Sequence, residues 1–135
     1  MRMASPSKQG MTFMKTLINW FEIPVADLDR AAHFYETVFA VKLNRAASGD
    51  GQMAIFPYAQ PATGGALCQS SFHKPGASGC IPYLDGGADL TAPLARAVSL
   101  GAKVLLGKTL ISPEIGFMAL FEDSEGNTIG LHSLA

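Results

Sequence analysis

Apolar and polar residues follow two different periods along this chain, and these periods predict strands and helices in a repeating order. Apolar residues recur at three- and four-residue spacing over residues 28–39, which predicts an amphipathic helix with Asp27 as its N-cap. β-Branched and aromatic residues at 17–25 predict a strand before this helix. Three short strands are predicted after it, at 41–45, 52–57 and 66–70. The first half therefore has the predicted order β-α-β-β-β.

The second half repeats this order. A strand is predicted at 80–85, followed by a helix that begins at a cap on Asp89 or Thr91 and ends near Leu100, before Gly101. A further strand is predicted at 103–106, and residues 107–114 are predicted to form a loop. Residues 116–133 place two apolar runs around a polar turn at 123–127, which predicts a β-hairpin with Gly126 at a position of positive φ.

The two halves also match weakly in sequence. Ala-Asp-Leu at 26–28 recurs as Ala-Asp-Leu at 88–90, and each triplet begins a predicted helix after a predicted strand. An internal repeat in a chain of 135 residues indicates one duplicated supersecondary unit. We therefore predict a single α+β domain over 15–135, with one unit at about 15–72 and the other at about 78–135. Residues 1–14 are expected to be a flexible leader.

Composition narrows the classes of function. Hydrophobic residues make up 48% of the chain, enough for one core, and the net charge of -1 gives no basis for nucleic-acid binding. No apolar run is long enough to cross a membrane, and the N-terminus has no apolar signal segment, so we expect a cytoplasmic protein. Cys68 and Cys80 form no zinc-type pair and are expected to be reduced thiols.

Three stretches carry a resemblance to a known family: INWFEIPVADLDRAAHFYETVF, DLTAPLARAVSLGAKVL and GFMALFEDSEGNTIGLHS. Together with the paired βαβββ order, they make the chain similar to the vicinal oxygen chelate superfamily, and in particular to a bacterial subgroup related to lactoylglutathione lyase. The resemblance implies two curved mixed sheets around a cavity and a homodimer. It also implies a small-molecule ligand, which many members hold on a divalent metal.

The resemblance places the metal ligands of the family on positions that do not suit a metal here. The ligand of the first strand falls on Trp20, and the carboxylate of the last strand falls on Gly130. The other two positions fall near residues 66–67 and 79–80, where Cys80 is the one side chain that binds metals. We therefore expect no metal and no other cofactor at the family's site.

Six residues remain as candidates for the site. Glu22 lies two positions after Trp20 and so shares its face of the strand, where an apolar cavity would raise the pKa of the carboxyl and suit it to act as a general base. The ligand-binding candidates are Trp20, Tyr83, Gly130, His132 and Glu114, with Gly130 expected to leave room for a ligand. His73, in the loop between the halves, is expected to be solvated.

Three functions stay open from the sequence. The first is a metal-free lyase or isomerase with Glu22 as its base. The second is a non-catalytic protein that binds and sequesters a small molecule, as bleomycin-resistance proteins do. The third is a metal-dependent enzyme like lactoylglutathione lyase, whose ligands would lie at other positions than those matched above.

Overall fold

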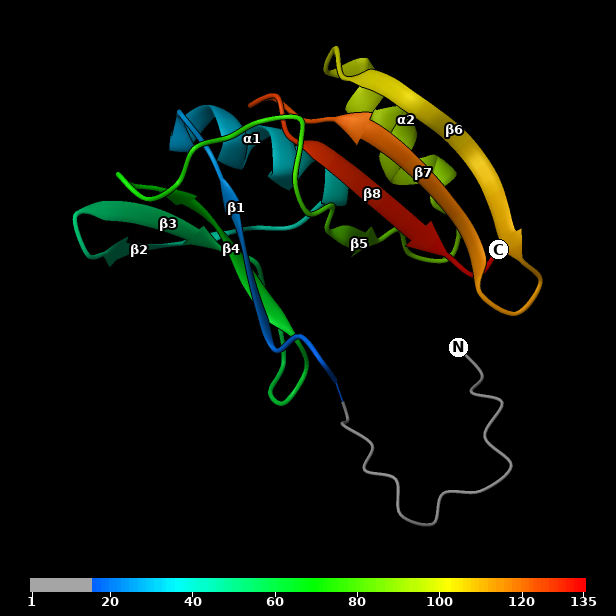
Figure 1. Ribbon diagram of the computed structural model, residues 1–135, viewed down its shortest axis with the longest axis horizontal. Coiled ribbons are helices and arrows are strands. Elements are labelled where there is room, and N and C mark those ends of the chain that lie inside the picture. The colour runs from blue at the N-terminus through cyan, green and yellow to red at the C-terminus, as the bar shows by residue number, and fades with distance from the viewer. Residues whose placement is uncertain (1–15) are drawn as a thin grey trace.

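Two βαβββ units make up the fold, as the repeat predicts. The computed structural model describes residues 16–135, so the predicted leader lies outside the described residues. The first unit consists of β1 (Trp20–Pro24), α1 (Leu28–Phe39), β2 (Asn44–Ser48), β3 (Gly51–Ile55) and β4 (Gly64–Gln69). The second consists of β5 (Tyr83–Asp85), α2 (Thr91–Ser99), β6 (Lys103–Ser112), β7 (Gly116–Glu122) and β8 (Thr128–Ser133) (Figure 1).

Each unit forms its own four-stranded mixed sheet with the same topology. The strand orders are β1-β4-β3-β2 and β5-β8-β7-β6, and in each sheet the first strand runs parallel to the last. The registers also correspond, because Trp20 lies opposite Gly64 in the first sheet as Tyr83 lies opposite Gly130 in the second. Equivalent positions in the two units can therefore be compared one by one.

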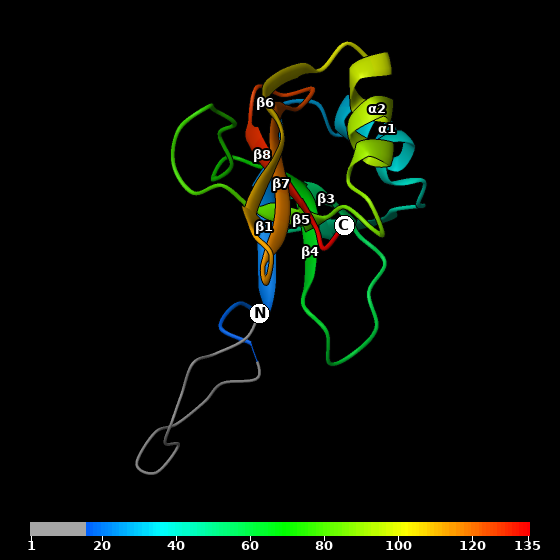
Figure 2. The same cartoon turned by 90° about the vertical axis from the view of Figure 1, so that its right-hand side faces the viewer.

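One hydrophobic core joins the two units. The helices lie side by side on one side of the sheets (Figure 2). Alternate strand residues such as Ile23, Phe121 and Leu131 are buried in the core together with Tyr35 of α1. The opposite face of each sheet, which we call the open face, carries no helix. Trp20 and Glu22 lie on the open face of the first sheet.

The first helix forms where the sequence predicts it. The Asp27 carboxylate accepts a hydrogen bond of 3.1 Å from the backbone N–H of Arg30, as expected of an N-cap. The second helix begins differently from the prediction, because Leu90 occupies the N-cap position and neither Asp89 nor Thr91 does. Asp89 still contributes, since its carboxylate accepts a hydrogen bond from the backbone N–H of Thr91.

Several predicted element boundaries are wrong. The strands predicted at 17–25, 41–45 and 80–85 begin only at Trp20, Asn44 and Tyr83. The predicted loop at 107–114 belongs largely to β6, which extends to Ser112. β6 pairs with β7 through several register shifts, and most of its residues are exposed. Backbone pairing with β7 therefore extends the strand past Gly107, where the sequence shows a local strand breaker.

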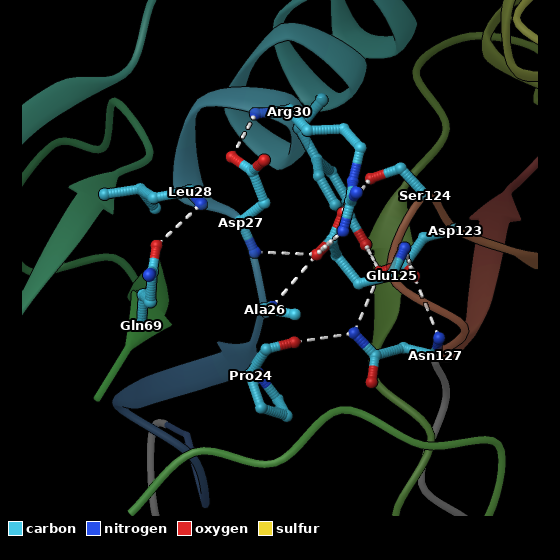
Figure 3. A network of polar contacts seen from close by, with 11 residues as sticks. Pro24, Ala26, Asp27, Leu28, Arg30, Gln69, Asp123, Ser124, Glu125 and Asn127 are labelled. Atoms are coloured by element: carbon cyan, nitrogen blue, oxygen red, sulfur yellow. Dashed lines mark hydrogen bonds and ion pairs between the residues drawn. The ribbon is translucent and has the colours of Figure 1, made fainter. Parts of the chain in front are cut away.

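The turn at 123–127 connects the second unit to the start of α1 (Figure 3). The Glu125 carboxylate accepts hydrogen bonds from the backbone N–H groups of Ala26 (2.9 Å) and Asp27 (3.0 Å), and it pairs with the Arg30 guanidinium at 2.7 Å. These contacts lower the pKa of Glu125 to about 2, chiefly through the hydrogen bond from Arg30. Asn127 adds a hydrogen bond of 2.8 Å to the carbonyl of Pro24. The predicted hairpin is confirmed, and its turn stabilises the contact between the units.

Candidate functional site

Four polar or aromatic side chains converge on the open face of the first sheet. The indole N–H of Trp20 donates to Glu22 Oε2 at 3.2 Å, which confirms that the two side chains share a face. The other carboxylate oxygen, Glu22 Oε1, lies 2.8 Å from Nε2 of His73. Cys68 of β4 faces the same group, and its sulfur, a His73 ring nitrogen and a Glu22 oxygen all lie within 4.8 Å of one another. The sequence brings these residues together from β1, β4 and the following loop.

The predicted rise in the pKa of Glu22 is wrong. Hydrogen bonds from His73 and then Trp20 lower the pKa of this carboxyl, and these effects outweigh the opposing effect of burial. A carboxylate that already accepts two hydrogen bonds and faces solvent at one side is a weak proton acceptor near neutral pH. Glu22 is thus better suited to hold a ligand group or a cation than to act as a general base.

His73 is a site residue that the sequence reasoning missed. Its side chain is only partly exposed (21%), in contrast to the solvated position that we expected. Nδ1 of His73 lies 2.6 Å from the hydroxyl oxygen of Ser70, which also accepts the backbone N–H of Phe72 at 3.1 Å. Both ring nitrogens of His73 therefore have defined partners, so the imidazole is held in a fixed orientation over β4.

The two cysteines are both free thiols, in agreement with the sequence, but their environments differ. Cys68 is buried and Cys80 is exposed. Burial, together with the negative charge of Glu22, raises the pKa of the Cys68 thiol to about 11. Cys68 on its own is therefore a poor nucleophile.

The position of the family's first metal ligand is covered by aromatic rings. Trp20 occupies that position, and its ring contacts Tyr58 edge-on, with ring centroids 5.9 Å apart. The Tyr58 ring also lies against Gly64, opposite Trp20, where an added Cβ would approach a ring carbon to 2.8 Å. A side chain that binds a metal has no room at residue 64 while Tyr58 keeps this position.

The equivalent position in the second unit is filled in the same way. The Tyr83 ring packs directly on Gly130, and a Cβ at residue 130 would overlap its ring atoms. Our prediction that Gly130 leaves room for a ligand is therefore wrong, because Tyr83 occupies this space. Tyr83 itself is half-exposed, so its outer face is available for contact. The strand registers place the other two ligand positions at Gly64 and Tyr83, and not near residues 66–67 and 79–80 as expected from the sequence. The four residues Trp20, Gly64, Tyr83 and Gly130 include no histidine, carboxylate or thiol ligand.

The two remaining candidates lie away from this group. His132 shares the open face of the second sheet with Gly130, but its Nε2 lies 2.6 Å from the backbone carbonyl oxygen of Ile115. Glu114 is exposed in the turn between β6 and β7 and does not line the cavities beside Trp20 and Tyr83. The structure therefore brings together Trp20 and Glu22 but places His132 and Glu114 elsewhere.

Two cavities flank the aromatic residues. One, of about 710 Å³, is lined by Trp20, Glu22, Cys80, Ile81 and Thr128, among others. The other, of about 670 Å³, lies between the units, and its wall includes five aromatic residues: Phe21, Phe39, Phe56, Tyr58 and Tyr83. Both volumes are in the range of small-molecule sites. The arrangement can therefore enclose an aromatic or apolar ligand, with Glu22 as a charged group at its edge.

Comparisons with known proteins agree with the fold. A family model described as bleomycin resistance protein-like N-terminal matches residues 18–56. An antibiotic binding protein, TnmS3 from Streptomyces sp. CB03234, is similar in structure (TM-score 0.65) and is 23% identical, over 92% of this chain and 100% of that protein. A glyoxalase/bleomycin resistance protein from the same organism has a TM-score of 0.59 and 26% identity, over 84% of this chain and 97% of that one. Glyoxalase I of Leishmania major has a TM-score of 0.65 and 18% identity, over 87% of this chain and 86% of that one.

The described residues have a fold of the glyoxalase and bleomycin-resistance type, which is the fold that the sequence resemblance implies. The family model covers residues 18–56 of the first unit. A search of curated protein sequences gives no match. Across residues 16–135, the structure contains no helix with the length and apolar character needed to cross a membrane.

Proposed function

We propose that this protein binds an aromatic or apolar small molecule on the open face and carries out no chemistry at the family's metal position. The proposal rests on one observation: aromatic rings fill the family's metal-ligand positions in both units. Tyr58 lies on Gly64 beside Trp20, and Tyr83 lies on Gly130. Aromatic rings offer large, rigid contact surfaces for planar ligands, whereas metal chelation of a substrate needs open coordination positions.

The structural neighbours support the same proposal. One of them is described as an antibiotic binding protein. Binding and sequestration of a toxic small molecule need a shaped apolar cavity but no acid, base or metal. The two cavities at the aromatic residues meet that requirement.

An enzymatic role has less support. A lyase or isomerase with Glu22 as its base would need a carboxyl with a raised pKa, whereas hydrogen bonds from His73 and Trp20 lower it. A metal-dependent lyase of the lactoylglutathione type would need ligands at the positions of Trp20 and Gly130.

A homodimer belongs to the proposal. The strand β6 carries several exposed apolar residues, namely Val104, Leu105, Leu106, Leu110 and Ile111. Exposed apolar side chains on a strand can be covered by a second copy of the chain. A second copy covering the open faces would also shield a bound ligand from water.

Fluorescence of the single tryptophan tests the proposal directly. Because Trp20 lines the 710 Å³ cavity, a ligand in this cavity should change its emission in a saturable way. We expect such titrations with a panel of aromatic antibiotics to identify a binder. Ile81→Ala, which shortens an apolar side chain in the wall of the same cavity, should weaken binding about fivefold.

The matched control is His33→Ala, because His33 is exposed on the helix side of the first unit. We expect this variant to bind like the wild type. Chromatography of the ligand after incubation separates binding from catalysis. A ligand recovered with altered structure, or the absence of saturable quenching across the panel, would contradict the proposal.

A further inference from the structure

The group formed by Glu22, Cys68 and His73 contains three different metal-ligating side chains. A carboxylate oxygen, a thiol sulfur and an imidazole nitrogen lie within 4.8 Å of one another. The closest pair is Glu22 Oε1 and His73 Nε2, at 2.8 Å. Among the described residues, these are the three that meet in this way. The convergence of three different donor atoms distinguishes this group from an ordinary surface ion pair.

This group does not coincide with the family's metal position. That position lies at the level of the Trp20–Gly64 pair, whereas Glu22 lies opposite Ala66 and Cys68 lies opposite Pro24. The group is therefore shifted by two to four residues along the strands, or about 7–13 Å. His73 reaches it from the loop after β4.

We propose that Cys68, His73 and Glu22 bind one divalent transition-metal ion of the zinc class. Thiolate, imidazole and carboxylate are the three side-chain ligands that Zn²⁺ accepts, and a three-residue set leaves one position open. Binding forms a metal–sulfur bond, and the thiol proton passes to solvent. The open position would face the cavity of about 710 Å³ that Glu22 lines.

The distances require shifts on the order of 1 Å, because the Cys68 sulfur lies within 4.8 Å of the other two ligand atoms. Zinc bonds of about 2.0–2.3 Å in a tetrahedron place neighbouring ligand atoms roughly 3.3–3.7 Å apart. His73 and Glu22 therefore need to separate slightly from 2.8 Å to admit an ion between them. Glu22 and His73 have room for this change because both side chains are partly exposed, while the buried Cys68 can stay in place.

Neighbouring residues hold two of the ligands in suitable orientations. The Ser70 hydroxyl oxygen lies 2.6 Å from His73 Nδ1, so it can accept a hydrogen bond from the Nδ1–H group. In that tautomer the lone pair of Nε2 is free to bind a metal. The Trp20 indole N–H binds Glu22 Oε2 and leaves Oε1 for the ion. Such outer hydrogen bonds are a regular feature of metal sites in proteins.

Cobalt titration of the untagged full-length protein tests the site. After treatment with a chelator, we expect Co²⁺ to bind in a 1:1 ratio with a thiolate-to-cobalt charge-transfer band in the near ultraviolet, and Zn²⁺ to remove this band. His73→Asn should weaken Zn²⁺ binding at least about a hundredfold, and Ser70→Ala about tenfold. Cys68→Ser should abolish the band.

Cys80→Ser is the matched control, because Cys80 is an exposed thiol that lines the same cavity but lies outside the three-residue group. It should retain both the stoichiometry and the band. A wild-type protein without the band, a band that persists in Cys68→Ser, or equal affinity in His73→Asn would each overturn the proposal. His73 lies in a loop, so its variant keeps the test decisive if Cys68→Ser fails to fold.

Metal binding by Glu22, Cys68 and His73 is independent of the proposed binding of a small molecule. Ligand binding can be measured by Trp20 fluorescence with chelator present. Loss of cobalt binding therefore leaves that result unchanged, and absence of a small-molecule ligand leaves the cobalt result unchanged.

Discussion

The two units share a backbone plan but use their open faces differently. Glu22 lies opposite Ala66 in the first unit at the level where Asp85 lies opposite His132 in the second. In the second unit these side chains bind local backbone, since Asp85 accepts the N–H of Gly87 at 2.8 Å and His132 contacts the carbonyl of Ile115. In the first unit the Glu22 side chain instead pairs with another side chain, that of His73.

The difference comes from the connecting loops. After β4 the chain turns back over the sheet, so that His73 reaches Glu22 from a position 51 residues later in the sequence. In the second unit, the partners of Asp85 and His132 are instead backbone groups of the turn after β5 and of the turn before β7. Equivalent strand positions therefore acquire different chemistry from the loops and turns beside them, and the duplicated topology alone does not determine the site.

The largest effect is expected where the two units are joined. Glu125→Gln removes the carboxylate that accepts the N–H groups of Ala26 and Asp27 and pairs with Arg30. Because charge-assisted hydrogen bonds are lost at a shielded position, we expect the free energy of unfolding to fall by about 2–3 kcal/mol. Urea denaturation of variant and wild type at pH 7 measures this difference.

The same contact predicts a dependence on pH. The folded-state pKa of Glu125 is about 2, below its ordinary value of 4.5. Its contribution to stability is therefore fully present above about pH 4.5 and is lost as the pH falls towards 2. The difference in the free energy of unfolding between Glu125→Gln and the wild type should therefore shrink as the pH falls from about 4.5 towards 2. Glu114→Gln, at an exposed carboxylate in the preceding turn, is the control. It should change neither the free energy of unfolding at pH 7 nor its dependence on pH.

A smaller effect is expected from the packing of Tyr83 on Gly130. Gly130→Ala introduces a Cβ into the space of the Tyr83 ring and should lower the free energy of unfolding by about 2 kcal/mol. In the background of Tyr83→Ala the same substitution should cost less than about 1 kcal/mol, because the ring is gone. A double-mutant cycle measured by urea denaturation gives the coupling. Additive effects of the two substitutions would show that the Tyr83 ring does not restrict the size of the side chain at residue 130.

Much of the fold followed from local sequence signals. The helix at 28–39 was predicted to the residue, because Asp27 marks its start and apolar spacing marks its length. The hairpin turn was predicted from Gly126, whose φ is indeed positive at 85°. The extent of β6 was not predictable in this way, since its pairing with β7 is a tertiary contact across bulges.

The candidate site was only partly predictable, for a physical reason of the same kind. Strand alternation correctly placed Trp20 and Glu22 on one face. The sign of the pKa shift of Glu22 depends on His73, whose approach is set by the path of a loop. A signal for Cys68 did exist, because parallel pairing of β1 with β4 places Glu22 and Cys68 on the same face two levels apart. Nothing local in the sequence indicates that the Tyr83 ring covers Gly130.

The smallest effect concerns how the two helices end. α1 ends at Ala40, whose φ of 54° lies in the left-handed region, whereas the equivalent residue after α2 is Gly101 with φ 89°. An alanine in this region is strained by about 1–2 kcal/mol, part of which is offset by the greater freedom of glycine in the unfolded chain. We therefore expect Ala40→Gly to raise the free energy of unfolding by about 0.5–1 kcal/mol, and Gly101→Ala to lower it by about 1 kcal/mol. Parallel urea denaturation of the two variants measures both values, and a loss of stability in Ala40→Gly would show that the end of α1 is not strained.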